Sequence, residues 1–242
     1  MKDLGKTIVI TNRKGGSGKT TTAKNIAYDL TLDGNRVLLI DLDPQCNATD
    51  GISGREYKHN VLDMLSFEKP KKYIYKTRFT DLDFIPGSDY LASTDIPDDV
   101  IKTQLHPLKS EYDYIVIDTS PYFNKLTAEI LKASDLVIVP SILDEDSLKG
   151  AMTTIHELST LFNNQIHCMV LPTMIDNSKF CRNQLNTLKQ GLDKLCFQSF
   201  IRTDYIHVRR AREWRCPLSY KYPKSKSARD YEDLTIELLE VL

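Results

Sequence analysis

The chain has 242 residues, a length that suits one sizeable domain with its own hydrophobic core. Hydrophobic residues make up 41% of it and the net charge is −1, so the overall charge predicts no polyanionic partner, and a nucleic-acid surface would have to be a local patch. Five scattered cysteines without a C-x-x-C pair argue against a zinc or iron–sulfur site. With no signal peptide and no membrane-length apolar run, we expect a cytoplasmic protein.

Apolar runs alternate with helical patterns along the chain, which is typical of a parallel sheet with crossover helices. We predict strands at 7–11, 36–41, 82–85, 114–118, 135–140, 166–171 and 197–201. We predict helices at 20–32, 60–66, 95–109, 124–133, 146–162, 178–195 and 227–241, and surface loops at 50–60 and 68–80. The expected fold class is α/β, a doubly wound, mostly parallel sheet flanked by helices, in one domain spanning 1–242.

A glycine-rich stretch, N-R-K-G-G-S-G-K-T-T-T at 12–22, lies between the first predicted strand and the first predicted helix. Glycines let several backbone N–H groups point at one anion, and the helix that follows adds the positive end of its dipole. Lys19 supplies a charge for the β- and γ-phosphates, and Thr20 a hydroxyl for Mg²⁺. This pattern predicts a nucleotide-binding loop made of Lys14, Gly15, Gly16, Ser17, Gly18, Lys19, Thr20 and Thr21.

The glycines also allow a second interpretation, a dinucleotide-binding G-x-G-x-x-G motif. Gly16 and Gly18 fit that pattern, and Asp41 lies near the distance expected for a ribose-binding acid. The third glycine position is Thr21, however, and this pattern leaves Lys19 without a role. The strict phosphate-loop pattern is not met either, because Arg13 stands where it has its first glycine.

Carboxylates follow the predicted strands at the edge where doubly wound sheets bind ligands. Asp118 ends an apolar strand, where it could hold a water of a Mg²⁺ ion beside Thr20. Asp41 and Asp43 are two residues apart, so an extended backbone would turn both toward the phosphates. A pair of acids that faces a phosphate loop is electrostatically costly without a cation, which favours Mg²⁺ at this edge.

Basic residues are concentrated between positions 202 and 229. Nine basic residues stand there against two acidic ones, so this window carries +7 and the rest of the chain −8. Such asymmetry predicts non-specific, salt-sensitive binding to the duplex DNA backbone, with an acidic protein partner as the alternative. The predicted DNA contacts are Arg202, Arg209, Arg210, Arg212, Arg215, Lys221, Lys224, Lys226 and Arg229. The last predicted helix is acidic, which argues against binding to anionic membranes.

These motifs resemble those of the ParA/MinD ATPases. K-G-G-S-G-K-T at 14–20 resembles their deviant Walker A motif, with Lys14 as its signature lysine. D-L-D-P-Q at 41–45 resembles their second signature, although Cys46 replaces a usual glycine. Asp118 stands where they have the Walker B aspartate, although Ser120 replaces a proline. The resemblance extends over essentially the whole chain and is more approximate after residue 200.

The resemblance implies a slow, Mg²⁺-dependent ATPase. Asp41 would lie near the Mg²⁺ shell, Asp43 would orient the attacking water, and Pro172, Thr173 and Met174 would lie by the adenine. Lys14 would reach into the partner's site of an ATP-bound sandwich homodimer. The implied function is DNA partition on the nucleoid, with a ParB-like partner stimulating hydrolysis. A ParA-like ATPase that positions a cargo other than DNA, and a MinD-like membrane ATPase, remain the alternatives.

Overall fold

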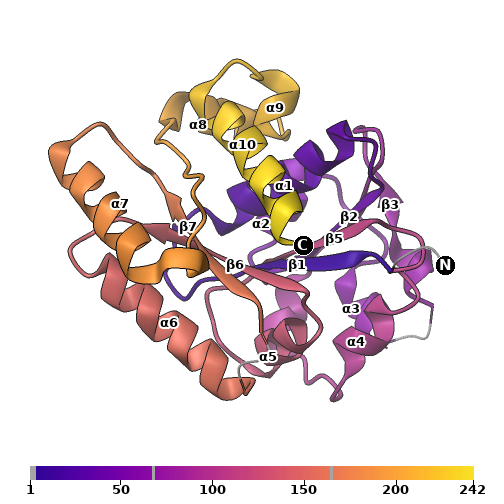
Figure 1. The fold of residues 1–242 in the computed structure, drawn as a ribbon. Helices are drawn as coiled ribbons and strands as arrows, with labels where there is room; N and C mark the ends of the chain where they lie inside the picture. Colours follow the sequence, from indigo (N-terminus) through magenta and orange to yellow (C-terminus); the bar gives the residue numbers. More distant parts are fainter. Residues whose placement is uncertain (1–3, 67–68, 164–165) are drawn as a thin grey trace.

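The computed structural model describes residues 4–66, 69–163 and 166–242 of the chain (Figure 1). Its described residues form a seven-stranded sheet in the order β3-β4-β2-β5-β1-β6-β7. Every pairing is parallel except that of β3 with β4. The strands are β1 (Lys6–Ile10), β2 (Val37–Leu42), β3 (Tyr75–Lys76), β4 (Leu82–Ile85), β5 (Tyr114–Thr119), β6 (Leu136–Ile142) and β7 (Cys168–Thr173).

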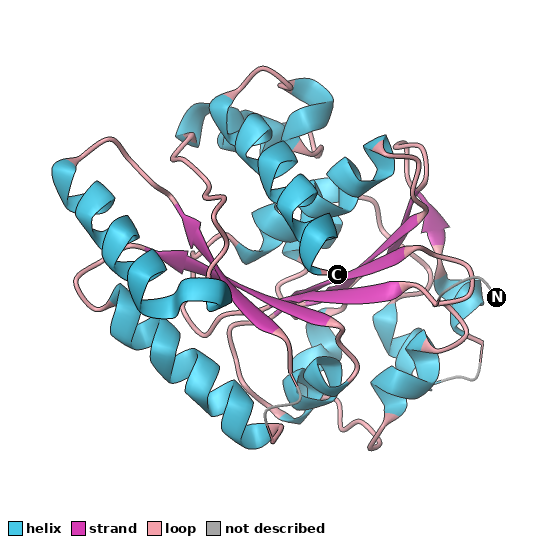
Figure 2. Ribbon diagram, in the orientation of Figure 1, coloured by secondary structure: helices cyan, strands magenta, loops and turns pink. Residues whose placement is uncertain are grey.

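Helices cover both faces of this sheet (Figure 2). They are α1 (Lys19–Leu32), α2 (Asn47–Ile52), α3 (Val61–Ser66), α4 (Val100–Leu105), α5 (Lys125–Lys132), α6 (Ser147–Leu161), α7 (Lys179–Leu192), α8 (Tyr205–Glu213), α9 (Leu218–Lys221) and α10 (Lys226–Val241). Short 3-10 turns occur at Pro70–Tyr73, Asp89–Ser93 and Asp193–Leu195. The predicted fold class, a doubly wound and mostly parallel sheet, is therefore confirmed.

Two apolar layers hold the helices to the sheet. Alternate residues of β2 face opposite sides: Leu38 and Ile40 pack with residues of α3 to α7, whereas Val37 and Leu39 pack with residues of α1 and α10. A strand buried on both faces needs apolar residues at every position, which explains the continuous apolar runs. The helices α1, α8, α9 and α10 lie together on one side, and α3 to α7 lie on the other (Figure 1).

The predicted strand at 197–201 is wrong. This segment runs beside β7, where Phe197 N–H donates to Val170 O at 3.0 Å and Ile201 N–H to Pro172 O at 2.9 Å. Between these bonds, however, the N–H groups of residues 198 and 199 donate to the Glu237 carboxylate on α10, at 2.6 and 2.7 Å. The side chain of a distant helix thus takes the backbone donors that a sheet ladder would need.

Other element boundaries also differ from prediction. The helix predicted at 95–109 is reduced to α4, because Pro97 disfavours helix for its preceding residue and Asp99 enters α4 with φ +57°. The helix predicted at 178–195 ends as α7 at Leu192. The loop predicted at 50–60 begins inside α2, and the loop at 68–80 contains β3, with residue 68 outside the described residues. The helices α8 and α9 were not predicted.

The terminal helix α10 packs on α1, where the Tyr231 and Thr22 hydroxyls lie 3.2 Å apart. Tyr231, Leu234 and Leu238 are at most 2% exposed, so the apolar side of α10 is covered by protein. The helix predicted at the end of the chain therefore packs on α1 and the sheet. No helix in the described part of the chain is long and apolar enough to span a bilayer.

Replacing Leu234 by alanine should destabilise the protein by about 2–5 kcal/mol, because this fully buried side chain joins α10 to the core. The matched control is Leu239→Ala on the same helix, where the side chain is 37% exposed and we expect a loss of about 0.5 kcal/mol or less. Urea unfolding measures both. Equal losses would show that α10 is not anchored by its buried side.

Asp29 on α1 should make stability depend on pH. It is 4% exposed, and burial raises its pKa from 3.8 to about 7, with the negative charge of Glu232 adding to the shift. Between about pH 4 and 7 the folded state keeps a proton that the unfolded state loses, so the free energy of unfolding falls as pH rises, by about 2–4 kcal/mol. Asp29→Asn should make the fall smaller by this amount in urea unfolding measured across the range, and the buried carboxyls of Asp41 and Asp118 should still contribute to what remains. Parallel curves for the two proteins would contradict it.

Candidate functional site

The loop between β1 and α1 has the conformation of an anion cradle. Gly16 and Gly18 have φ of +73° and +96°, in the left-handed region that favours glycine. Thr22 N–H donates to Gly18 O at 2.8 Å, so the helix begins at the end of the glycine stretch. The free N–H groups of this first turn therefore face the loop, as anion binding at a helix N-terminus requires.

Side chains tie this loop to the neighbouring strands. The Asn12 amide donates to Pro140 O of β6 at 2.6 Å, and its oxygen accepts the N–H of Lys14 at 3.0 Å. The Thr173 hydroxyl at the end of β7 donates to Ser17 O at 3.0 Å. The loop is thus held at the carboxyl-end edge of β1, β6 and β7.

A cavity of about 380 Å³ opens at this edge. Of the predicted nucleotide-binding residues, Gly15, Gly16, Gly18, Lys19, Thr20 and Thr21 line it, together with Asp43 and Met174. Residues outside the predicted site complete the wall, namely Lys24, Asn25, Gln45, Asn47, Pro121, Val208, Ala211, Cys216 and Leu218, beside Arg212 from the predicted DNA surface.

Lys19 is the cation at the centre of this cavity wall. It is 6% exposed and its ammonium donates to Lys14 O at 3.4 Å. Burial lowers its pKa, and the negative charges of Asp118 and Asp43 oppose that shift. The side chain therefore lies between the loop backbone and two carboxylates, where an added phosphate would complete its environment.

Asp41 and Asp118 are register partners on neighbouring strands, and both are fully buried. Burial raises the pKa of Asp41 to about 6, and burial together with the charge of Asp41 raises the pKa of Asp118 well above its usual range. The nearby Thr20 hydroxyl opposes this rise in the pKa of Asp118. Among the described residues, however, neither carboxylate oxygen of Asp118 has a hydrogen-bond partner of good geometry.

An orphaned carboxylate beside a threonine hydroxyl fits Mg²⁺, a hard cation that takes oxygen ligands and keeps several waters. Nowhere in the described ranges do three His, Cys, Asp or Glu side chains gather closely enough to hold a metal on their own. The donors here therefore suit a metal that water and substrate phosphates help to coordinate.

The two acids of the 41–45 segment have different surroundings. The Asp41 carboxylate accepts the backbone N–H and the hydroxyl of Thr49, at 2.8 and 2.7 Å, and the N–H of Asp43 at 3.1 Å. Asp43 lines the cavity, and its carboxylate accepts Gln45 N–H at 2.9 Å. Asp41 thus lies behind the cavity wall, anchored to α2, while Asp43 faces the cavity.

Lys14 extends away from the cavity wall and is about half exposed, with its ammonium paired to Asp144 in the loop between β6 and α6. The neighbouring Arg13 makes a second pair with Glu157 of α6, at 3.1 Å. Both cations of the loop entrance are therefore accessible and bound by surface carboxylates, where ion pairs are weak and exchangeable.

The predicted adenine contacts are only partly brought together. Thr173 and Met174 line a second cavity of about 70 Å³, whereas Pro172 is a buried residue of β7 that accepts Ile201 N–H. Opposite them lie Thr203, Asp204, Tyr205 and Val208, which sequence reasoning missed. No motif marks these residues, and the wrong strand at 197–201 hid the turn into α8.

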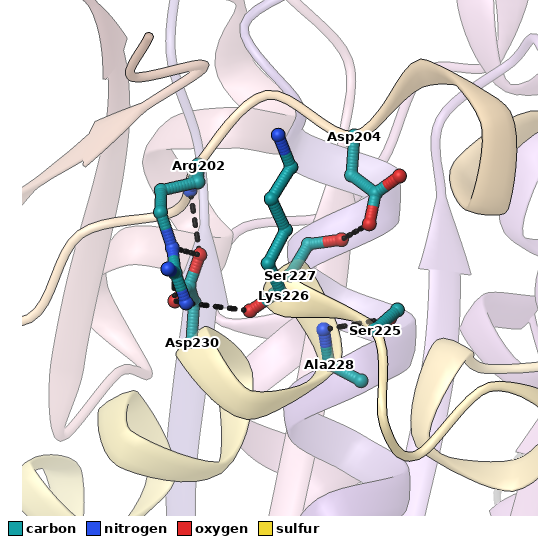
Figure 3. A network of polar contacts seen from close by, with 7 residues as sticks. All are labelled: Arg202, Asp204, Ser225, Lys226, Ser227, Ala228 and Asp230. Carbon is teal, nitrogen blue, oxygen red and sulfur yellow. Dashed lines mark hydrogen bonds and ion pairs between the residues drawn. The ribbon is translucent and has the colours of Figure 1, made fainter. Parts of the chain in front are cut away.

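Arg202 is the least suited of the predicted DNA contacts. Its Nε and Nη2 donate to the Asp230 carboxylate at 2.6–3.0 Å, and its backbone N–H donates to the same group at 2.7 Å. Figure 3 shows this pair beside the Asp204–Ser227 hydrogen bond, while the Lys226 side chain extends away from it. Arg202 therefore ties the turn into α8 to the start of α10.

The other eight predicted DNA contacts divide into two groups. Arg212 lines the larger cavity, and Arg215 donates to the carbonyls of Ser53 and Gly54 after α2. The remaining six are exposed around α8, α9 and the start of α10. We call them the basic surface: Arg209, Arg210, Lys221, Lys224, Lys226 and Arg229.

The two departures from the family motifs have visible consequences. Cys46 precedes α2 with φ +51°, a left-handed conformation that glycine adopts without strain. Ser120 closes its turn with the side chain, since its hydroxyl accepts Tyr122 N–H and donates to Tyr122 O, both at 3.3 Å. A weak side-chain turn thus stands where the family has a proline.

Comparison with known proteins agrees with this geometry. Residues 5–168 match a family model described as an AAA domain (AAA_31). The chain is 32% identical to the sporulation initiation inhibitor protein Soj of Bacillus subtilis, over 97% of this chain and 98% of Soj. It is 30% identical to the chromosome partitioning protein ParA of Myxococcus xanthus, over 98% of this chain and 89% of that protein.

A solved structure of a plasmid partition protein from Borrelia burgdorferi, bound to AMPPNP, superposes with a TM-score of 0.85 at 25% identity, covering 98% of this chain and all of that one. Sequence similarity over the full length, the fold and the loop geometry lead to one assignment. The chain belongs to the ParA family of partition ATPases.

Proposed function

We propose that this chain is one ATPase domain that partitions DNA, binding duplex DNA as an ATP-bound dimer and releasing it after hydrolysis. The observation that carries the ATPase part is that the glycine-rich loop, Lys19, Thr20 and Asp43 line one cavity, with the buried carboxylates of Asp41 and Asp118 on the strands behind it. The partition role is supported by similarity to Soj and ParA over nearly the full length.

The loop residues would bind the phosphates of ATP, with the N–H groups of Gly16 to Thr21 as donors and Lys19 as the cation. Thr20 and Asp118 would hold Mg²⁺, with Asp41 nearby, and the bound metal would neutralise charge on the β- and γ-phosphates. Asp43, which faces the cavity, would accept a hydrogen bond from the attacking water and orient it. Met174 and Thr173 would lie against the base.

Lys14 would act across a dimer interface. Its ammonium lies outside the cavity wall, half exposed, and its ion pair with Asp144 is of the exchangeable surface type. An ATP phosphate from a second subunit would offer this lysine a stronger partner than a single surface carboxylate. ATP would thus favour the homodimer and hydrolysis would weaken it, which makes nucleotide state a switch.

The basic surface would bind the backbone of duplex DNA without reading its sequence. Its six exposed cations come from α8, α9 and the start of α10, and Lys221 is stacked over the Trp214 ring at 3.6 Å. Two copies in a dimer would bind one duplex more tightly than either alone. On this basis the protein would be cytoplasmic and nucleoid-associated, with a ParB-like protein stimulating hydrolysis.

Lys14→Ala should abolish ATP-dependent DNA binding while ATP binding persists, because Lys14 lies outside the cavity that would hold the phosphates. Duplex binding measured with ATP, ADP or no nucleotide should be strong only with ATP for the wild type. The variant should lose about 100-fold in affinity, as expected when avidity is removed. Strong ATP binding without DNA binding at low salt would refute the DNA role and direct attention to another cargo.

Arg210→Ala should weaken DNA binding equally for scrambled and native sequences, because phosphate contacts carry no sequence information. Each lost phosphate contact should also reduce the slope of log affinity against log salt by about 0.9. The matched control is Arg182→Ala, an exposed arginine on α7 at the opposite face of the sheet. Equal effects of the two substitutions would show that the basic surface is not the DNA site.

A further inference from the structure

Helix α2 connects the acid pair of the ATP site with the basic end of α8. On the ATP side, Thr49 of α2 donates two hydrogen bonds to the buried Asp41 carboxylate, at 2.8 and 2.7 Å. Gly87 N–H in turn donates to the Thr49 hydroxyl at 2.9 Å. A shift of α2 would therefore move the groups that hold Asp41 in place.

At its other end, α2 is held by two cations. The Lys24 ammonium donates to Gly51 O at 3.4 Å, and Arg215 Nη1 donates to Ser53 O at 3.4 Å and Gly54 O at 3.3 Å. The last carbonyls of a helix lack partners within it and carry partial negative charge, so cations stabilise this end. Lys24 is on α1, whereas Arg215 follows α8, so the two come from different parts of the chain.

Two glycines make these contacts possible. A Cβ on Gly51 would lie 2.3 Å from the Lys24 ammonium, and a Cβ on Gly54 would lie 2.1 Å from the Arg215 guanidinium carbon. Atoms cannot approach so closely, so any side chain at either position would displace the cation. Gly34 provides a contrast, since it has φ +80° and no atom within 4 Å of its would-be Cβ.

Arg215 is itself fixed in an unfavourable conformation. It has φ +50°, and its carbonyl and that of Trp214 accept hydrogen bonds from Arg78 at 2.9 and 2.6 Å. Such a backbone conformation is strained for a residue with a side chain. The guanidinium is nevertheless exposed, with only Nη1 bonded to α2, so an anion on the basic surface could reach its other donors.

We propose that Arg215 is a positioning residue for ATP hydrolysis: it holds the end of α2, and through Thr49 the Asp41 carboxylate, from the DNA-binding side of the molecule. Lys24 assists from α1. A DNA phosphate bound by the same guanidinium would change its hold on α2, and the hydrolysis rate would respond. The expected effects on ATP hydrolysis and on its response to DNA rest on the proposed function. The contact between Arg215 and the end of α2 does not depend on that function.

The test compares Arg215→Ala, Arg215→Lys and Gly54→Ala with the control Gly34→Ala. In the absence of DNA, Arg215→Ala and Gly54→Ala should lower the kcat of ATP hydrolysis about tenfold relative to wild type. The dissociation constant of ATP should stay within about twofold of the wild-type value. Both should also abolish the response of kcat to saturating duplex DNA. Arg215→Lys, which keeps a cation near these carbonyls, should recover part of the rate, and Gly34→Ala should behave as wild type.

Hydrogen exchange of the nucleotide-free protein provides the independent readout. Arg215→Ala and Gly54→Ala should speed exchange in residues 47–54 about fivefold and leave the centre of α1 unchanged. Unchanged exchange in 47–54, or an unchanged kcat and DNA response in Arg215→Ala, would overturn the inference. A wild type that does not hydrolyse ATP would instead overturn the proposed function, and the exchange data would still decide whether Arg215 holds α2.

Discussion

The buried carboxylates of Asp41 and Asp118 impose the constraint on which the site depends. They are register partners on adjacent parallel strands with no exposed surface, so charging both without a cation is unfavourable. Three features relieve this conflict: the raised pKa values of both carboxyls, the hydrogen-bond donors around Asp41, and the positive charge of Lys19 near Asp118. A metal ion with its nucleotide would relieve it more completely.

The phosphate loop and α2, which flank Asp41 and Asp118, differ in how firmly they are attached to the rest of the fold. On one side the phosphate loop is tied to β6 through Asn12 and to β7 through Thr173, and the Thr119 hydroxyl of β5 donates to Ile10 O at 2.9 Å. On the other side, α2 has only six residues and depends on side chains at both ends. A metal bound at this pair would therefore have a firmly held frame on one side and a short, separately held helix on the other.

Short sequence patterns correctly predicted the central strands and the phosphate loop, whose conformations depend on neighbouring residues in the sequence. Continuous apolar runs identified the central strands, and glycines with the lysine and threonine that follow identified the phosphate loop, because those conformations need those residues. Long-range contacts decided the rest. Glu237 of α10 kept 197–201 out of the sheet, and Asp230 of α10 pairs with Arg202, which leaves this arginine fewer donors for DNA. The roles of Lys24 and Arg215 depend on glycines far away in sequence, so composition and spacing could not reveal them.

Two of the non-glycine residues with positive φ contact the ends of α2. Cys46, with φ +51°, precedes the helix, and Arg215, with φ +50°, holds the carbonyls that follow it. Glycine would adopt either conformation at lower cost, so each side chain must contribute something that offsets the strain. For Arg215 that contribution is the hydrogen bonding and charge at the end of α2. A six-residue helix that depends on contacts at both ends has little stability of its own, so a change in charge at a bound metal or at the basic surface would shift it.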